Sequence, residues 1–350
     1  MFVYWSIFLL PAWASFFRVR STRAAALFGW AATWLTLTLL IGFRHEVGAD
    51  WFNYIGHYEL NYYLSFWEAV QRFDPAHAAI NALAYRMDWG VYGANLVYGA
   101  IFSLGLIAFC RAQPRPLLAL AVAVPYLVVV VAMGYSRQGV AIGLAFFALL
   151  ALAERNTLKF VVFVAIAAAF HKTAVVLIPI AALASTKNRL WTAAWVGATG
   201  VLFYFLYLQE AADTLISGYV EAKRDSGGGA IRVVMNAIPA LLFLLNRKRF
   251  RLEQAELSLW TWISLIAVAF LPVFVLSPSS TAVDRVALYF IPLQLYVFSR
   301  LPDALWRGRH RLAVSGGVVA YYGLVMFVWL NLGSHSKYWL PYQFYPLVDV

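Results

Sequence analysis

The sequence predicts an all-α integral membrane protein, a polytopic helix bundle in which residues 1–350 form a single transmembrane domain. Hydrophobic residues make up 63% of the chain and charged residues only 12%, whereas charged residues reach about a quarter of an ordinary soluble domain. Apolar runs recur along the whole length, and most can cross about 30 Å of hydrocarbon as a helix of about 20 residues. An outer-membrane barrel would alternate apolar and polar residues instead, so we exclude that class.

We expect about twelve transmembrane helices from runs of this length. In chain order they are residues 2–17, 24–43, 91–110, 117–133, 138–152, 158–170, 173–184, 190–208, 231–245, 257–276, 283–298 and 312–330. Only His171 and Lys172 separate the runs at 158–170 and 173–184, which could be two tilted helices or one long helix. Two crossings fit better, because Lys187 and Arg189 then return to the cytoplasmic side.

The orientation follows from the basic residues between the spans. Arg18, Arg20 and Arg23 lie between the first two runs, so the positive-inside rule predicts that this turn is cytoplasmic and that both termini are outside. Most of the 27 Lys and Arg residues, but few of the 16 Asp and Glu residues, then lie on the cytoplasmic side. The net charge of +11 therefore indicates topology, and we expect no nucleic acid partner.

Two longer segments are predicted on the outer side. Residues 44–88 carry aromatic residues at spacings that suit helices lying in the membrane interface, and the Asp74-Pro75 pair is a helix-start signal. Residues 209–230 form a second outer loop that ends in three glycines. The chain has one cysteine, Cys110, so an intrachain disulfide is excluded.

The positive-inside rule leaves a group of ionisable residues unexplained, because they lie on the outer side at predicted helix ends. Ionisable side chains so close to hydrocarbon usually mark a pathway or a site, although any one of them can be a snorkelling or ion-paired end residue. They are Arg44, Glu46, Asp50, Asp74, Arg137, His171, Lys172, Arg232, Asp284 and Arg285.

Several of these residues suit the binding of phosphate or proton transfer. Arg137 lies in a very short turn, and its guanidinium suits a bidentate contact with phosphate oxygens; an internal ion pair with Asp50 or Asp284 is the alternative. His171 beside Lys172 suits a base next to an anion, or a helix cap. Arg232 lies at the start of a helix, after the triple glycine. The glycine segment could be flexible and close over an anion, or it could be a plain linker.

Aromatic residues cluster in the first outer segment, among them Trp51, Tyr54 and Tyr58. They form either part of an interfacial aromatic belt or a groove whose rings stack on sugars. The sequence lacks HExxH, GxSxG, a P-loop, a Cys/His cluster and a paired Asp motif in the first outer loop. We therefore expect neither a metal nor another cofactor.

The order of these landmarks resembles the EpsG family of exopolysaccharide polymerases, which is similar in role to the Wzy-like polymerases. The landmarks are Arg44-x-x-x-Gly48-x-Asp50-Trp51-x-x-Tyr54, Asp74-Pro75, Ser136-Arg137-Gln138-x-x-Ala141, Phe170-His171-Lys172-Thr173-Ala174 and an arginine late in the chain. The resemblance covers about residues 40 to 300. Asp74 stands where the family more often has Glu before Pro, a difference that keeps the carboxylate.

The resemblance implies a glycosyltransferase with a GT-C-like architecture in the bacterial inner (plasma) membrane. It would join repeat units carried on undecaprenyl diphosphate during exopolysaccharide biosynthesis, at a metal-independent active site facing the periplasm or exterior. The expected partners are the lipid-linked glycan, the lipid bilayer and, in addition, a chain-length regulator or flippase.

This chemistry needs a cationic site for the leaving diphosphate and a base for the acceptor hydroxyl. The candidates for diphosphate binding are Arg137, Lys172, Arg232, Arg285 and Arg44. The candidates for the base are His171, Asp50 and Glu46, with a slight preference for His171 because a carboxylate near several arginines is a weak base.

Two other classes of function remain open at this point. In a flippase or other transporter of lipid-linked oligosaccharides, the same charges would line a path, which should place ionisable residues at several depths rather than on one side. A membrane O-acyltransferase of a glycan would also need a histidine and a basic pocket, together with a cytoplasmic entry for the acyl donor.

Overall fold

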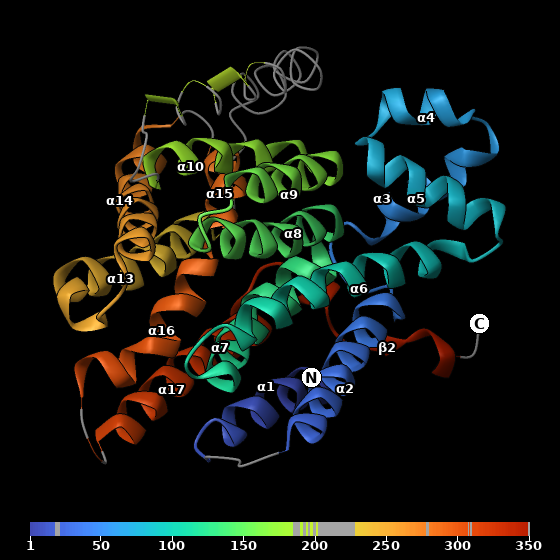
Figure 1. Cartoon of the computed structure of the whole chain (residues 1–350). Helices are drawn as coiled ribbons and strands as arrows, with labels where there is room; N and C mark the ends of the chain where they lie inside the picture. Colours follow the sequence, from blue (N-terminus) through green and yellow to red (C-terminus); the bar gives the residue numbers. More distant parts are fainter. Residues whose placement is uncertain are drawn as a thin grey trace. The chain divides into compact units, whose positions relative to one another are not determined.

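The computed structural model describes residues 1–17, 22–184, 228–277, 280–306, 308 and 310–348, with a few single positions between 190 and 201. This part of the chain is helical apart from one sheet of two short strands (Figure 1), which confirms the helical class. The chain divides into two compact units. Unit 1 comprises Met1–Phe146, Ala169–His171 and Leu312–Val350, and unit 2 comprises Phe147–Ala168 and Lys172–Arg311.

Unit 1 is built on apolar helices that pack along one another. α2 (Arg23–Gly42) lies beside α6 (Gly90–Arg111), and α1 (Phe2–Ala14) packs against α7 (Pro116–Ala123) and the π-helix η2 (Val124–Ala132) (Figure 1). These helices are apolar almost all round, which is typical of membrane spans and of helices buried inside a bundle.

Glycines allow two helices of unit 1 to touch backbone to backbone. α8 (Ser136–Ala153) begins in unit 1 and crosses α6. A Cβ atom on Gly105 would lie 1.9 Å from the carbonyl oxygen of Gly143, and a Cβ atom on Gly143 would lie 2.6 Å from the Phe102 Cα. No hydrophobic force drives helices together in lipid, so they associate largely through van der Waals packing, and small residues allow the close approach that this packing needs.

The segment between α2 and α6 folds into short elements around the beginning of α6. They are β1 (Arg44–His45), α3 (Trp51–Glu59), η1 (Leu60–Tyr62), α4 (Phe66–Arg72) and α5 (Pro75–Arg86). Local sequence explains the helix starts: Ser65 and Glu68 form a capping box at α4, and Pro75 occupies the first turn of α5.

The end of the chain returns to this segment. It comprises α17 (His310–Leu332), η8 (Ser336–Tyr338), β2 (Gln343–Phe344) and η9 (Tyr345–Leu347). β2 pairs antiparallel with β1, with Arg44 opposite Phe344. The fully buried Trp339 donates from its indole Nε1 to the Val129 carbonyl oxygen at 2.7 Å, inside the π-helix. The C-terminal segment thereby fixes both the loop after α2 and the π-helix.

Unit 2 is a second set of apolar helices, in which α13 packs against α14, α15 and α16. Its elements are α9 (Thr157–Phe170, whose last two residues belong to unit 1), η3 (Lys172–Leu177), α10 (Ile178–Ala184), α13 (Gly229–Asn246), η6 (Arg247–Phe250), α14 (Gln254–Leu276), α15 (Ser280–Ala287), η7 (Leu288–Phe290) and α16 (Pro292–Leu305). A buried amide pair, Gln294 Nε2 to Asn236 Oδ1 at 2.6 Å, joins α16 to α13.

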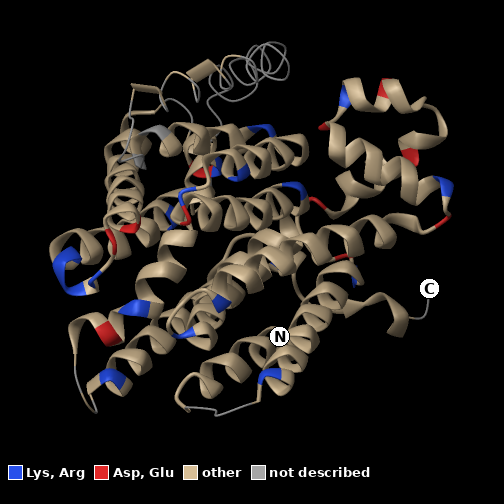
Figure 2. Ribbon diagram, in the orientation of Figure 1, with Lys and Arg blue, Asp and Glu red and all other residues tan. Residues whose placement is uncertain are grey.

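Six helices of the described residues are long and apolar enough to cross a membrane. They are Arg23–Gly42, Gly90–Arg111, Ser136–Ala153, Gly229–Phe250, Gln254–Leu276 and His310–Leu332, and four shorter apolar helices accompany them. Figure 2 shows that most charged residues lie near helix ends or in connecting segments. The chain is thus a multi-pass helical membrane protein, while the number of about twelve crossings is not supported.

Three predicted spans differ from the helices observed. Residues 173–184 form a 3-10 helix followed by the short α10, and residues 283–298 divide between α15, η7 and α16. Residues 117–133 are helical throughout, but the second half is the π-helix η2. Apolar composition alone does not reveal such breaks, because proline at a first turn, as Pro292 in α16, starts a helix as readily as it interrupts one.

Other predictions lie outside the described residues. They concern Arg18, Arg20, Lys187 and Arg189, the span at 190–208 except for a few positions, and residues 209–227 of the second outer loop.

Candidate active site

The first turn of α8 is the centre of the site in unit 1. η2 ends at Ala132 and α8 starts at Ser136. The Arg44 guanidinium donates to Ser136 Oγ at 2.7 Å, and the Tyr54 hydroxyl accepts from the backbone N–H of Arg137 at 3.3 Å. The first N–H groups of a helix have no partner within it, so Tyr54 satisfies one of them and fixes the position of Arg137.

Arg44 is fully buried, and each guanidinium nitrogen donates to a protein atom. Besides Ser136, its acceptors are the carbonyl oxygens of Ile41 and Val47 and the Asn95 side chain. Burial lowers the pKa of Arg44 to about 10, so the side chain is charged at neutral pH. This geometry argues against the predicted contact of Arg44 with a diphosphate and indicates that it joins the ends of three helices.

The loop after β1 needs glycine at position 48. Its φ is +104°, and a Cβ atom there would lie 2.4 Å from the Met133 carbonyl oxygen. Its N–H donates to the Tyr338 carbonyl oxygen at 2.8 Å. Only glycine combines this backbone conformation with so close an approach, and the contact places the loop against the start of α8.

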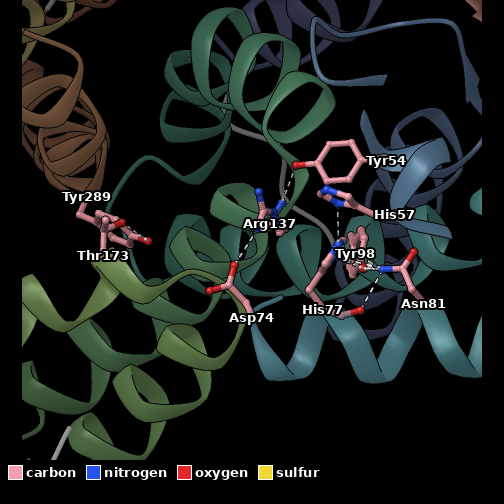
Figure 3. A network of polar contacts seen from close by, with 9 residues as sticks. All are labelled: Tyr54, His57, Asp74, His77, Asn81, Tyr98, Arg137, Thr173 and Tyr289. Carbon is pink, nitrogen blue, oxygen red and sulfur yellow. Dashed lines mark hydrogen bonds and ion pairs between the residues drawn. The ribbon is translucent and has the colours of Figure 1, made fainter. Parts of the chain in front are cut away.

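Arg137 and Asp74 form an ion pair at this point, with Nη1 and Oδ2 2.9 Å apart (Figure 3). The Asp74 side chain is 8% exposed and that of Arg137 is 29% exposed. Asp74 is the N-cap residue of α5 but makes no side-chain cap hydrogen bond. Within the described residues, Arg137 Nε is a buried donor without a partner. Because the Arg137 side chain is partly exposed and Asp74 engages its Nη1, part of the guanidinium is left for an anion. The predicted alternative was an ion pair with Asp50 or Asp284; the partner observed is Asp74 instead.

Two histidines that the sequence analysis did not select lie beside this pair. His57 Nδ1 is 3.2 Å from His77 Nε2, and His77 Nδ1 is 2.8 Å from the Tyr98 hydroxyl (Figure 3). His77 is fully buried. Burial, followed by the charge of Arg137, lowers the pKa of both, for His57 to about 4. Both are therefore neutral at physiological pH. The signal in the sequence was helical spacing, since His57 follows Tyr54 by three residues on α3.

The Phe170-His171 motif also belongs to this unit. The Phe170 ring meets the Tyr98 ring edge to face, with centroids 6.3 Å apart, and His171 follows directly at the end of α9, partly buried. Asp50 accepts from the Asn53 side chain at 3.3 Å, and Glu46 is exposed at a φ of 52°. All three predicted bases thus lie in unit 1, and the geometry does not rank them.

The aromatic residues of the first motif are mostly buried. Trp51 is 2% exposed and Tyr54 4% exposed, and Trp51 packs against Tyr92 and Arg44. Their burial argues against the predicted stacking of a sugar on these two rings. Tyr58 is only partly buried and packs beside Tyr85. The exposed aromatic side chains of this region are instead Phe52, Tyr62, Tyr63 and Trp67.

The remaining predicted cations lie in unit 2, on elements that pack together. α15 carries Arg285 and packs against α13 and against η3, which begins with Lys172. Arg232 on α13 binds both carboxylate oxygens of Asp284 on α15, and both side chains are buried. This bidentate pair uses two guanidinium nitrogens of Arg232 and fixes the position of α15.

Metal ligation was not expected from the sequence. Across the described part of the chain, no group of three or more His, Cys, Asp or Glu side chains could hold a metal ion. Metal independence stays a prediction.

Comparison with known proteins identifies the family. The model of the EpsG family matches residues 27–344 of the 350 in the chain. No curated protein and no solved structure matches the chain. The match extends through β2 and so includes the strand that pairs with β1 in the loop after α2. Since the match covers nearly the whole sequence, the chain belongs to the EpsG family.

Proposed function

We propose that this protein is a polysaccharide polymerase that joins oligosaccharide repeat units carried on undecaprenyl diphosphate. Membership of the EpsG family implies a membrane polysaccharide polymerase. In this proposal the lipid diphosphate is the leaving group and the transfer needs no metal. The active site faces the periplasm or exterior of a bacterial inner membrane.

One observation carries the proposal: separate stretches of sequence meet at the first turn of α8 and at the adjoining Tyr98 ring. Tyr54 contacts the backbone of Arg137, Asp74 pairs with its side chain, and Phe170 lies against the same network through Tyr98. Each belongs to one of the landmarks that resemble the family. A purely structural ion pair does not require that two of these landmarks contact one partly exposed arginine and that a third contacts the adjoining Tyr98 ring.

The arrangement supports stabilisation of a diphosphate leaving group. When the bond between the anomeric carbon and the lipid diphosphate breaks, negative charge develops on the departing oxygen. The Arg137 side chain is 29% exposed and Asp74 pairs with its Nη1, so the rest of the guanidinium can neutralise that charge. Asp74 holds the guanidinium in place beforehand, so little reorganisation is needed during the reaction.

The other half of the reaction is attack by a sugar hydroxyl. The acceptor oxygen bonds to the anomeric carbon of the donor, the base takes the hydroxyl proton, and the lipid diphosphate leaves with the electron pair of the broken bond. We retain His171 as the preferred base because a carboxylate close to several arginines is a weak base. Asp50 and Glu46 remain the alternatives, and inversion by single displacement is the expected course.

Lys172 and Arg285 remain candidates for further contacts with the phosphates. They lie on η3 and α15, two elements that pack within unit 2. Arg232 is proposed mainly to position α15, because Asp284 engages two of its nitrogens. A chain-length regulator or flippase as partner is a proposal that rests on the family alone.

The test is reconstitution of the purified protein in liposomes with a defined lipid-diphosphate repeat unit. Wild type should form oligomers without added metal or nucleotide sugar, and Arg137→Ala should lose this activity by at least about hundredfold, as expected for the loss of a preorganised charge contact in a transition state. Arg86→Ala is the matched control, because Arg86 is an exposed arginine of the same unit. Movement of the lipid-linked sugar across the bilayer without oligomer formation would support a flippase and reject the polymerase.

A further inference from the structure

The hydrogen-bond directions in the histidine network can be assigned from one fixed point, the Asn81 amide. Asn81 Nδ2 lies 2.8 Å from the His77 carbonyl oxygen. A carbonyl oxygen only accepts, so this atom must be the nitrogen of the amide and not its oxygen. The same nitrogen lies 2.9 Å from the Tyr98 hydroxyl, and 3.2 Å and 3.4 Å from Nδ1 and Nε2 of His77. An amide nitrogen only donates, so the Tyr98 hydroxyl cannot give its hydrogen to Asn81.

The Tyr98 hydroxyl then has one hydrogen to donate. Tyr98 is buried, 2% exposed, and a buried hydroxyl that left its hydrogen without a partner would lose stability. Its other neighbour is His77 Nδ1 at 2.8 Å. Tyr98 therefore donates to Nδ1 of His77, and neutral His77 carries its proton on Nε2.

The same reasoning extends to His57. His77 Nε2–H points to His57 Nδ1 at 3.2 Å, so Nδ1 of His57 is the acceptor and neutral His57 carries its own proton on Nε2. His57 is partly exposed. Its Nε2 makes no hydrogen bond to any residue that the structure describes and is not among the buried polar atoms without a partner.

The charges around His57 maintain its neutral form. Arg137 on α8 and Arg72 on α4 both lower its pKa, after burial, to about 4. His77 on α5 and the Phe73 ring, whose centroid is 4.4 Å away, cover other sides of the imidazole. A neutral imidazole with the proton on Nε2 offers a donor at its open edge and has no lone pair there to act as a base.

We propose that His57 is a substrate-binding residue that donates a hydrogen bond from Nε2 to an anionic phosphate oxygen beside Arg137, and that Asn81, Tyr98 and His77 are positioning residues that fix this tautomer. The inference rests on the proposed function, because the anion is identified as the lipid diphosphate of the donor. Together, Arg137 and His57 supply one charged and one neutral donor to the leaving group, and neither takes the proton of the acceptor.

Nitrogen-15 NMR of labelled histidine tests the tautomer directly, because the two ring nitrogens have different shifts in each tautomer. The chain has six histidines, and His57→Gln assigns the His57 signals by their loss. At pH 7.5 wild type should show neutral His57 and His77 with the proton on Nε2. In Tyr98→Phe the shorter of the two contacts to His77 Nδ1 is lost, while Asn81 Nδ2 stays 3.2 Å away, and both histidines should partly populate the Nδ1–H tautomer. A wild-type His57 with its proton on Nδ1, or a protonated His57, would overturn the proposal.

Inorganic pyrophosphate tests the binding role with the wild-type protein. Its addition should shift the His57 Nε2 signal. The apparent affinity for pyrophosphate, measured from this shift, should be at least about tenfold weaker in Arg137→Gln, as expected for loss of a charged contact. Absence of a shift up to concentrations that inhibit polymer formation contradicts the proposal.

Polymer formation provides the third readout. His57→Leu should lower kcat/KM by about tenfold to hundredfold, and His57→Gln, whose amide can still donate, should recover most of it. Equal losses in both variants reject a donor role. If wild type forms no polymer at all, the proposed function fails, while the NMR result on the tautomer still stands or falls by itself.

Discussion

Asp74 fixes the position of the Arg137 guanidinium through an ion pair that is only partly accessible to water. The carboxylate is buried and the guanidinium is not fully covered, so the ion pair loses less to screening than a surface pair does. Breaking a buried pair leaves the remaining charge uncompensated. Asp74 therefore contributes to both the fold and the orientation of Arg137.

Asp74→Asn separates these two contributions, since asparagine keeps the size and removes the charge. We expect polymer formation to fall about tenfold or more, because Arg137 loses its fixed partner, while the protein still folds with an unfolding temperature a few degrees lower. Initial rates and thermal unfolding in detergent measure both. Asp88→Asn is the control, since Asp88 is exposed at a φ of 54°, which asparagine accepts. Full activity in Asp74→Asn would show that the ion pair is not needed.

The histidine pair predicts how stability depends on pH. The pKa of His57 is about 4 in the fold against its ordinary 6.5, and that of His77 is also well below its ordinary value. Between about pH 4 and pH 6.5 the unfolded chain binds more protons than the folded protein, so the free energy of unfolding rises with pH. This contribution is complete above pH 6.5 and is lost as the pH falls toward 4. The unfolding temperature of wild type should therefore drop more steeply between pH 7 and 5 than that of His57→Gln; parallel curves would refute the assignment.

At the scale of elements, three contacts hold the loop after α2 against the start of α8. Arg44 reaches Ser136, Gly48 approaches the Met133 carbonyl group, and β2 pairs with β1. Trp339 adds a link from the C-terminal segment to the π-helix. A π-helix leaves backbone carbonyl groups in irregular positions and often occurs next to functional sites, and here it directly precedes the turn that carries Arg137.

Gly48→Ala tests this contact. The added methyl group would clash with the Met133 carbonyl oxygen at a φ that disfavours alanine, and we expect a loss of about 1–3 kcal/mol of stability with lower activity. Gly56→Ala is the matched control in α3, because nothing lies within 4 Å of its Cβ position and alanine favours a helix over glycine. Thermal unfolding compares the two variants, and equal stability would remove the argument for a close approach at Gly48.

For the whole molecule, the sequence was informative where the physical signal is local. Composition and run length predicted a helical membrane protein, and the long apolar helices such as α2, α6 and α14 lie close to the predicted runs. The breaks within 173–184 and 283–298 were missed because hydrophobicity does not report where a helix ends inside an apolar run. The return of the C-terminal segment to β1 depends on tertiary contacts that no local pattern encodes.

The site shows the same division. Arg137, His171 and Asp74 stood out because ionisable residues near hydrocarbon are costly, and the structure gathers the stretches that carry them in unit 1. Arg44 attracted attention for the same reason, yet its cost is met by internal hydrogen bonds. His57 and His77 were missed because a neutral histidine carries no charge signal, and their pairing joins α3 to α5.

The side of the membrane that the ionisable residues face stays a prediction. If the ionisable residues of the two units face one side of the membrane, single cysteines at positions 50, 137, 171 and 285 should all react with an impermeant reagent from outside. Cys110 is buried and can be replaced by alanine to give a cysteine-free background. Labelling of any of these positions only from the cytoplasmic side would contradict the predicted orientation.

The stoichiometry of the reaction catalysed by the purified protein tests whether this protein transfers glycan from a lipid diphosphate. Released lipid diphosphate and newly formed glycosidic bonds are measured in one time course with a defined lipid-linked repeat unit. We expect one lipid diphosphate to be released for each bond formed, with both rates lost together in Arg137→Ala and retained in Arg86→Ala. Bond formation that persists in Arg137→Ala, or release of lipid diphosphate without bond formation in wild type, would contradict this expectation.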